Sequence, residues 1–382
     1  MSAIRHGVSP TVTRVRYCKH CLTPDTRPRI EFDAEGVCNA CRNAETKEHI
    51  DWDKRRQEFF DYVERFRPKS GPYDCVVPWS GGKDSSAIAY RLKFDFGLNP
   101  LLVTASPLIP NDIAVHNREE MLKLGFDHVM VRPNQKVARH LTRRFFEERG
   151  NPKVHWEATK EAVPVSAAVR YGIPLVFYAE HGESEYGGRV LSEESKKVRD
   201  VTEVIEHVIG DDSHNWIDEV VTERDLAPYL YPDPADIQRV GVTALYYAYF
   251  FKWSMFENYE YLKDKIDFRT APGGRTDGTF TNFDSLDDKI DTLYYHMQFV
   301  KFGFGRAVRD ASRMIQTGHL TRAEGLKYAR AYDAEPPHTY FADQLEYLGM
   351  TEAEVRAVID KHRNTEIWKF EGNQWQLRFP PE

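Results

Sequence analysis

One short segment of this 382-residue sequence combines glycines, hydroxyls and a cation in an order suited to holding phosphate. Residues 80–86 read Ser-Gly-Gly-Lys-Asp-Ser-Ser. Glycines let backbone N–H groups approach an anion closely, serines add hydroxyl donors, and lysine adds a mobile positive charge. We therefore assign the binding of nucleotide phosphates to Ser80, Gly81, Gly82, Lys83, Asp84, Ser85 and Ser86.

The residues on either side of this segment predict the elements that hold it. Residues 75–77 are an apolar run suited to a buried strand, and residues 85–93 have helical spacing. A loop between a strand and a helix start gathers N–H groups at the positive end of the helix dipole. The spacing is not that of the Walker loop, G-x-x-x-x-G-K-[ST], and a plain serine-glycine turn is the alternative.

Two pairs of cysteines predict a metal site. Cys18 and Cys21 form one C-x-x-C pair, and Cys38 and Cys41 form the other. Each pair places two sulfurs on one tight turn, and two such turns complete a tetrahedron suited to Zn²⁺. Because four protein ligands leave no open position, the site is expected to be structural. Four unrelated thiols, or a redox role for one pair, are the alternatives.

Apolar runs that alternate with helical stretches predict the fold class. Continuous apolar strands between helices are typical of an α/β fold with a parallel sheet and helices on both faces. Strands are expected at 75–77, 100–104, 127–131 and 174–178, and helices at 112–124, 135–149 and 157–171. We expect a zinc ribbon at 1–50, a helix and linker at 51–72, the α/β domain at 73–232, and a mainly helical region for substrate or partner binding at 233–382. Residues 241–262 are expected to form a core or interface helix, and an aromatic-walled pocket for a sugar or nucleobase is the alternative.

Ligands of parallel sheets bind beyond the carboxyl ends of the strands, which selects two further segments. After the second strand, Thr104, Ala105 and Ser106 are small enough for an adenine or ribose to lie flat. After the fourth strand, residues 180–188 read Glu-His-Gly-Glu-Ser-Glu-Tyr-Gly-Gly. The acids of this segment can hold Mg²⁺ or orient a polar substrate. An ordinary turn and a solvated acidic loop are the respective alternatives.

A later segment places cations beside glycines and aromatic rings. Residues 301–306 read Lys-Phe-Gly-Phe-Gly-Arg. Lys301 and Arg306 can present positive charge to a nucleotide phosphate or a sugar carboxylate. A helix-breaking turn with solvent-facing bases is the alternative.

Composition excludes several classes of protein. The net charge of −7 gives no general attraction to nucleic acid. The first residues lack the apolar core of a signal peptide, and the most apolar stretch, 242–251, is too short to span a bilayer. We therefore expect a cytoplasmic protein without membrane insertion and without a nucleic-acid partner.

These motifs together resemble a known enzyme family. The phosphate loop is similar to that of the N-type ATP pyrophosphatases, and with the ribbon and the 180–188 and 301–306 segments the chain resembles the N-acetyl sugar amidotransferases of bacterial surface-polysaccharide and nonulosonic acid synthesis. The family often has Gly-Glu-Asn where this chain has Gly182-Glu183-Ser184.

The resemblance implies an ATP-dependent reaction that needs Mg²⁺. The amide oxygen of an acetamido sugar, often nucleotide-linked, attacks the α-phosphorus of ATP, and ammonia then displaces AMP to leave an acetamidino group. On this basis we assign catalysis to Lys83, Asp84 and Glu183, nucleotide binding also to Gly182, and substrate binding to Glu180, Tyr186, Lys301 and Arg306.

The resemblance also implies partners, since the sequence shows no glutaminase domain. Separate glutaminase and cyclase-like subunits are expected to deliver the ammonia. A tRNA thiolase with the same loop is the first alternative function, and a non-enzymatic zinc-ribbon scaffold is the second.

Overall fold

A five-stranded parallel sheet forms the centre of the protein. The computed structural model describes residues 14–68, 70–200 and 209–382. The strand order is β3-β2-β1-β4-β5, and every neighbouring pair is parallel. The predicted α/β class is therefore confirmed. The strands are β1 (Cys75–Pro78), β2 (Pro100–Ala105), β3 (Asp127–Val131), β4 (Leu175–Tyr178) and β5 (Thr243–Tyr246).

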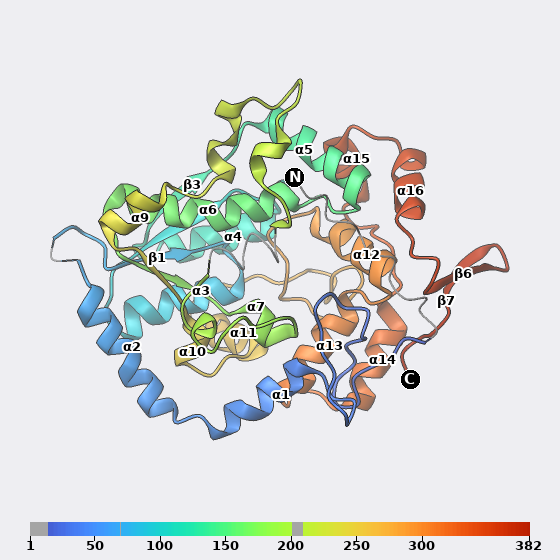
Figure 1. Ribbon diagram of the computed structural model, residues 1–382, viewed down its shortest axis with the longest axis horizontal. Coiled ribbons are helices and arrows are strands. Elements are labelled where there is room, and N and C mark those ends of the chain that lie inside the picture. The colour runs from blue at the N-terminus through green and yellow to red at the C-terminus, as the bar shows by residue number, and fades with distance from the viewer. Residues whose placement is uncertain (1–13, 69, 201–208) are drawn as a thin grey trace.

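Alternating side chains of β1 face two separate cores. Val76 belongs to a cluster with the apolar face of α6 (Val154–Tyr171). Its neighbour Val77 belongs to the opposite cluster, which contains side chains of α2 (Trp52–Phe66) and α3 (Lys83–Tyr90). Helices thus cover both faces of the sheet, as a parallel sheet requires (Figure 1).

The predicted helix at 241–262 is wrong over its first residues. This stretch forms β5, then α10 (Tyr247–Phe250), and only then α11 (Met255–Lys263). Thr243 and Tyr246 suit a pleated strand, and the free edge of β4 offers a parallel partner. The sheet therefore extends past residue 232. The outer edge of β5 is covered by residues 197–199, since Tyr246 N donates to Lys197 O and Arg199 N donates to Ala244 O.

The C-terminal region is mainly helical and holds the N-terminal ribbon. Buried side chains from residues 18–41 of the ribbon, from α13 (Arg306–Gln316) and from α14 (Arg322–Tyr332) form one apolar cluster, and Figure 1 shows this part of the ribbon lying against these helices. Thr321 and Thr351 cap their helices through reciprocal bonds with the glutamates three residues on. The elements are α12 (Asp291–Phe302), α13 (Arg306–Gln316), α14 (Arg322–Tyr332), α15 (Phe341–Leu348), α16 (Glu352–Lys361), β6 (Trp368–Glu371) and β7 (Gln374–Leu377).

The remaining elements connect these parts. Within the described ranges, no helix combines the length and apolar character needed to cross a bilayer. The other helices are α1 (Asn39–Thr46), α4 (Asp112–Leu122), α5 (Gln135–Arg149), α7 (Gly182–Tyr186) and α9 (Pro234–Val240), with shorter turns at Lys47–His49, Arg91–Asp95, Glu194–Lys196, Ser213–Trp216 and Glu223–Tyr229.

Candidate functional site

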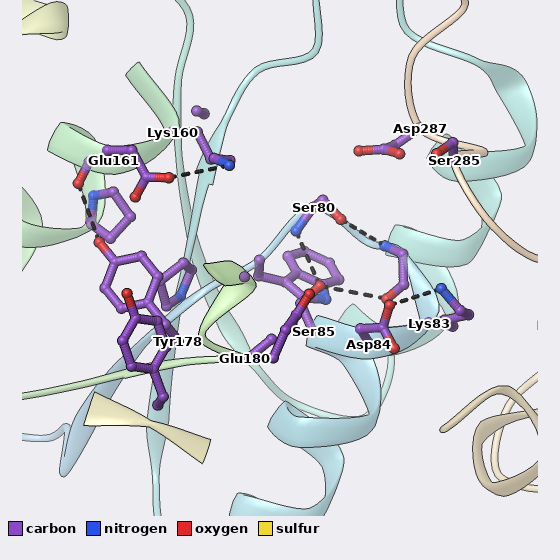
Figure 2. A pocket seen from close by; sticks show the side chains of 18 of the residues that line it. Ser80, Lys83, Asp84, Ser85, Lys160, Glu161, Tyr178, Glu180, Ser285 and Asp287 are labelled. Carbon is purple, nitrogen blue, oxygen red and sulfur yellow. Dashed lines mark hydrogen bonds and ion pairs between the residues drawn. The ribbon is translucent and has the colours of Figure 1, made fainter. Parts of the chain in front are cut away.

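A cavity of about 450 Å³ opens at the carboxyl ends of the strands. Residues that follow β1 and β4 line it, together with residues 283–287 of the C-terminal region. The chain leaves β1 toward β2 on one side, whereas β4 lies on the other side of β1. This is the switch point at which ligands of open α/β sheets bind, and we call it the first cavity. Figure 2 shows Ser80, Asp84 and Ser85 on one side of it and Glu161 and Tyr178 on the other.

The phosphate loop is held by local hydrogen bonds. Gly82 N donates to Ser80 Oγ over 3.0 Å, and Ser80 N donates to Ser85 Oγ over 3.3 Å. Gly81 has φ +87°, and a Cβ there would lie 2.3 Å from Cγ of Arg118. Helix α3 begins at Lys83, within the phosphate segment and directly after Gly82, so the positive end of its dipole lies at residues 80–82.

Lys83 is buried between two carboxylates. Its side chain is 3 % exposed, and Nζ lies 2.7 Å from Oδ2 of Asp84 and in close contact with Oδ1 of Asp284. Burial alone lowers the pKa of this lysine, but Asp284 and Asp84 raise it above its ordinary value. Lys83 is therefore a fixed cation on the wall of the first cavity.

Asp284 joins Lys83 to the C-terminal helices. Arg309 Nη2 donates to Asp284 Oδ2 over 3.0 Å, and Arg306 Nη2 donates to the Asp284 carbonyl over 2.7 Å. Burial raises the pKa of Asp284, but Lys83 and the arginines hold it well below its ordinary value. Arg306 is buried behind Asp284 and does not line the first cavity.

The 180–188 segment brings Glu180 and Glu183 to the first cavity, where each has a different partner. The Tyr186 hydroxyl donates to Glu180, whose pKa is raised by burial and by Asp84. Glu183 lines the cavity, and its carboxylate accepts hydrogen bonds from Nε and Nη2 of Arg29 at 2.9 and 2.8 Å. Asp84 also accepts from Asn258 Nδ2 over 3.0 Å. Glu180, Gly182, Glu183 and Tyr186 therefore line the first cavity together.

Other predicted residues lie at or beyond the wall. Ala105 lines the first cavity, whereas Thr104 and Ser106 are buried and bond to backbone carbonyls of Trp79 and Pro107. Lys301 lies elsewhere, since Nζ donates to the carbonyl of Arg149 over 2.8 Å. The structure therefore does not bring Lys301 to the other site residues.

The four cysteines converge on one point, as their spacing predicts. All four are fully buried, and their Sγ atoms lie within 4.8 Å of one another. Two Sγ–Sγ distances, Cys18–Cys41 and Cys21–Cys38, are 3.8 and 3.7 Å. Four sulfurs about 2.3 Å from a central Zn²⁺ would be about 3.8 Å apart, so the donor set fits this metal. Within the described residues, no other group of three or more His, Cys, Asp or Glu side chains converges in this way.

Sequence reasoning missed Asp284, Arg309 and Arg313. One face of α13 carries Arg306, Arg309 and Arg313 at positions i, i+3 and i+7. This helical spacing could have indicated from the sequence that the three cations lie together. Arg313 stacks on Tyr186, with Cζ 3.4 Å from the ring centroid. Asp284 lies in an acidic stretch whose sequence gives no sign that it faces Lys83.

Comparisons with known proteins give two distant similarities. An uncharacterized protein of Methanocaldococcus jannaschii is 31% identical over 87 residues, which is 22% of this chain and 31% of that protein. The chain thus spans about a third of the length of this curated relative. A crystal structure described as a predicted subunit of tRNA methyltransferase from the same organism has 18% identity, covers 47% of this chain and 92% of its own, and has a TM-score of 0.23. A TM-score this low carries no argument about fold or function.

A family model matches the C-terminal region more directly. Residues 277–379 match the C-terminal domain of WbpG-like LPS biosynthesis proteins. The matched segment includes Asp284 and all of α13. This similarity agrees with the resemblance to surface-polysaccharide amidotransferases and supports a role in polysaccharide biosynthesis.

Proposed function

We propose that this protein is an ATP-dependent amidotransferase that converts the acetamido group of a sugar, nucleotide-linked in the favoured case, into an acetamidino group for bacterial surface polysaccharide. The observation that carries this proposal is the meeting of two parts in the first cavity. The phosphate loop supplies Lys83, and the region that matches WbpG-like proteins supplies Asp284.

The residues of the cavity suit the activation of an amide oxygen. That oxygen attacks the α-phosphorus of ATP and pyrophosphate leaves, which gives an O-adenylyl imidate. Ammonia adds to the former carbonyl carbon, and AMP departs with the oxygen. The loop and Lys83 bind the β- and γ-phosphates and stabilise the charge that grows on them as they leave. Mg²⁺, when bound, offsets further phosphate charge, and Asp84 is the loop carboxylate that fits it.

The source of ammonia is proposed to be separate glutaminase and cyclase-like subunits in the cytoplasm. A cysteine glutaminase needs an accessible thiolate. Four of the five cysteines belong to the ribbon cluster, and the fifth, Cys75, is fully buried in β1 with its thiol pKa raised by burial. The same burial argues against a tRNA thiolase, which needs a sulfur-handling thiol near the loop.

The test is direct detection of both products. The purified protein is incubated with ATP, Mg²⁺, ammonium chloride and candidate acetamido sugars, and pyrophosphate release and sugar mass are followed. We expect a sugar in which oxygen is replaced by NH, formed together with pyrophosphate. Robust turnover with glutamine by the single chain would contradict the separate glutaminase. Absence of sugar-dependent pyrophosphate release across nucleotide-linked acetamido sugars would overturn the proposed function.

A further inference from the structure

A second cavity lies behind the wall of the first. Its volume is about 290 Å³, and it is bounded by α1, α7, the segment before α11 and the end of α13. Tyr186 lines both cavities. The two spaces therefore share this aromatic ring as a common wall.

The second cavity has one cation that no carboxylate neutralises at close range. The two lysines that line it are both paired: Lys47 with Glu185, and Lys252 with Glu48, whose Oε1 lies 3.4 Å from the Lys252 Nζ. Arg313 forms no ion pair with the described residues, and its Nε has no hydrogen-bond partner among them. Glu180 and Asp284 feel its charge only from farther away. The lining thus carries an uncompensated positive charge.

Two further features of the cavity wall favour an anionic ligand. Trp253 is 5 % exposed, and its Nε1–H has no acceptor among the described residues. A buried donor without a partner is costly, so its presence at a cavity indicates a ligand that accepts hydrogen bonds. Helix α11 begins at Met255 on the same wall, and the N-terminus of a helix favours negative charge.

We infer that the second cavity binds the anionic group of the acetamido sugar substrate while the acetamido group reaches ATP in the first cavity. This inference rests on the proposed function and adds a place and a chemistry for substrate recognition. Arg313 and the Trp253 Nε1–H are the donors, and Tyr186 is the surface over which the sugar lies. The phosphate of a nucleotide linkage and the carboxylate of an acidic sugar share the required chemistry.

Calorimetry with three probes tests this subsite. The intact protein is first saturated with a non-hydrolysable ATP analogue and Mg²⁺, so that the phosphate loop is occupied. UDP-N-acetylglucosamine, N-acetylneuraminate and neutral N-acetylglucosamine are then titrated separately. We expect at least one anionic probe to bind about tenfold or more tightly than the neutral sugar, because charge-assisted hydrogen bonds are strong. Preference for the first probe identifies phosphate, and preference for the second identifies carboxylate. No preference for either would overturn the inference.

Two substitutions locate the preference. Arg313→Gln removes the charge, and Trp253→Phe removes the N–H while keeping a ring. Each should weaken the anionic probe about tenfold and leave the neutral sugar unchanged. Arg356→Gln, on the exposed face of α16, is the control. Thermal melting checks that each variant folds.

The outcomes separate the inference from the proposed function. Formation of the acetamidino product with unchanged anion affinity in both variants would overturn the subsite alone. Anion binding that depends on Arg313 and Trp253, without any sugar-dependent pyrophosphate release, would overturn the amidotransferase and leave the anion subsite in place.

Discussion

Lys83 and Asp284 form a buried ion pair across 201 positions of sequence. This contact ties the phosphate loop to the WbpG-like region, so neither side of the first cavity is complete without the other. Asp284 also compensates Arg306 and Arg309.

Asp284→Asn removes the negative charge that Lys83, Arg306 and Arg309 share. We expect the free energy of unfolding to fall by about 3–5 kcal/mol, because buried cations lose their partner. We also expect pyrophosphate release to be abolished. Urea denaturation and a pyrophosphate assay measure the two effects. Asp343→Asn, which breaks a more exposed pair with Lys289, should change stability by less than about 1 kcal/mol. Wild-type stability and turnover in Asp284→Asn would show that the contact is dispensable.

Lys83→Met should lower kcat of sugar-dependent pyrophosphate release by about 10²–10³-fold, since a preorganised cation at the leaving phosphate is lost. The protein should still fold, because Asp284 keeps its ion pairs with Arg306 and Arg309. Lys301→Met is a matched control at a lysine that lies away from the first cavity, and it should keep its activity. Equal losses in both variants would point to a general effect on the fold.

Gly81→Ala tests the loop backbone. Both the positive φ and the close approach to Arg118 exclude a Cβ, so we expect the Kd for an ATP analogue to rise at least about tenfold. Gly97→Ala is matched in backbone conformation, with φ +70°, but its Cβ would meet nothing within 4 Å. Calorimetry should show unchanged nucleotide affinity for that control. Tight binding by Gly81→Ala would place the nucleotide elsewhere.

Removal of zinc should affect α13 as well as the ribbon. Leu22 and the cysteines share an apolar cluster with Val308 and Ala311 of that helix. Cys38→Ser should lose bound zinc, measured by elemental analysis, and lower the melting temperature by several degrees or more, since structural zinc contributes folding energy. Cys75→Ser leaves the metal ligands intact and should retain full zinc occupancy.

Glu335→Gln should destabilise the protein in a pH-dependent way. The Glu335 carboxylate accepts hydrogen bonds from Nη1 and Nη2 of Arg275, at 2.6 and 2.8 Å, and from the Gly278 N–H. These bonds lower the pKa of Glu335 to about 2. A lowered carboxyl pKa contributes stability above the unfolded pKa of about 4.3, and that contribution is lost as pH falls toward the folded value. After allowance for solvent screening, we expect a difference of about 1–2 kcal/mol near pH 7 that shrinks toward zero below about pH 3.

Urea denaturation of both proteins across this pH range measures that difference. Glu352→Gln, in an exposed i,i+4 pair with Arg356, is the control and should change stability by less than about 0.5 kcal/mol. A difference for Glu335→Gln that grows as pH falls would contradict the assigned role of this carboxylate.

Features encoded by neighbouring residues were predictable from the sequence. The cysteine pairs, the strand-loop-helix around Lys83 and the caps at Thr321 and Thr351 each depend on residues a few positions apart. Strand β5 was missed because its four residues lead directly into the aromatic stretch of α10, which fits a helix or a strand, and the vacant edge of β4 decides between them.

The composition of the site depended on contacts that no local pattern encodes. Lys301 and Arg306 are five positions apart, yet Gly303, with φ +75°, ends α12 and redirects the chain. Lys301 therefore points toward Arg149, whereas Arg306 points toward Asp284. The partner of Lys83 is likewise chosen by the packing of distant segments.

The cover over β5 restricts how copies of this protein can associate. Because residues 197–199 already bond to the outer edge of β5, that side of the sheet cannot accept a strand from another molecule without displacing them. Pairing of this five-stranded sheet with a strand of another molecule, and fibre growth by that route, would have to begin at its opposite edge, along β3.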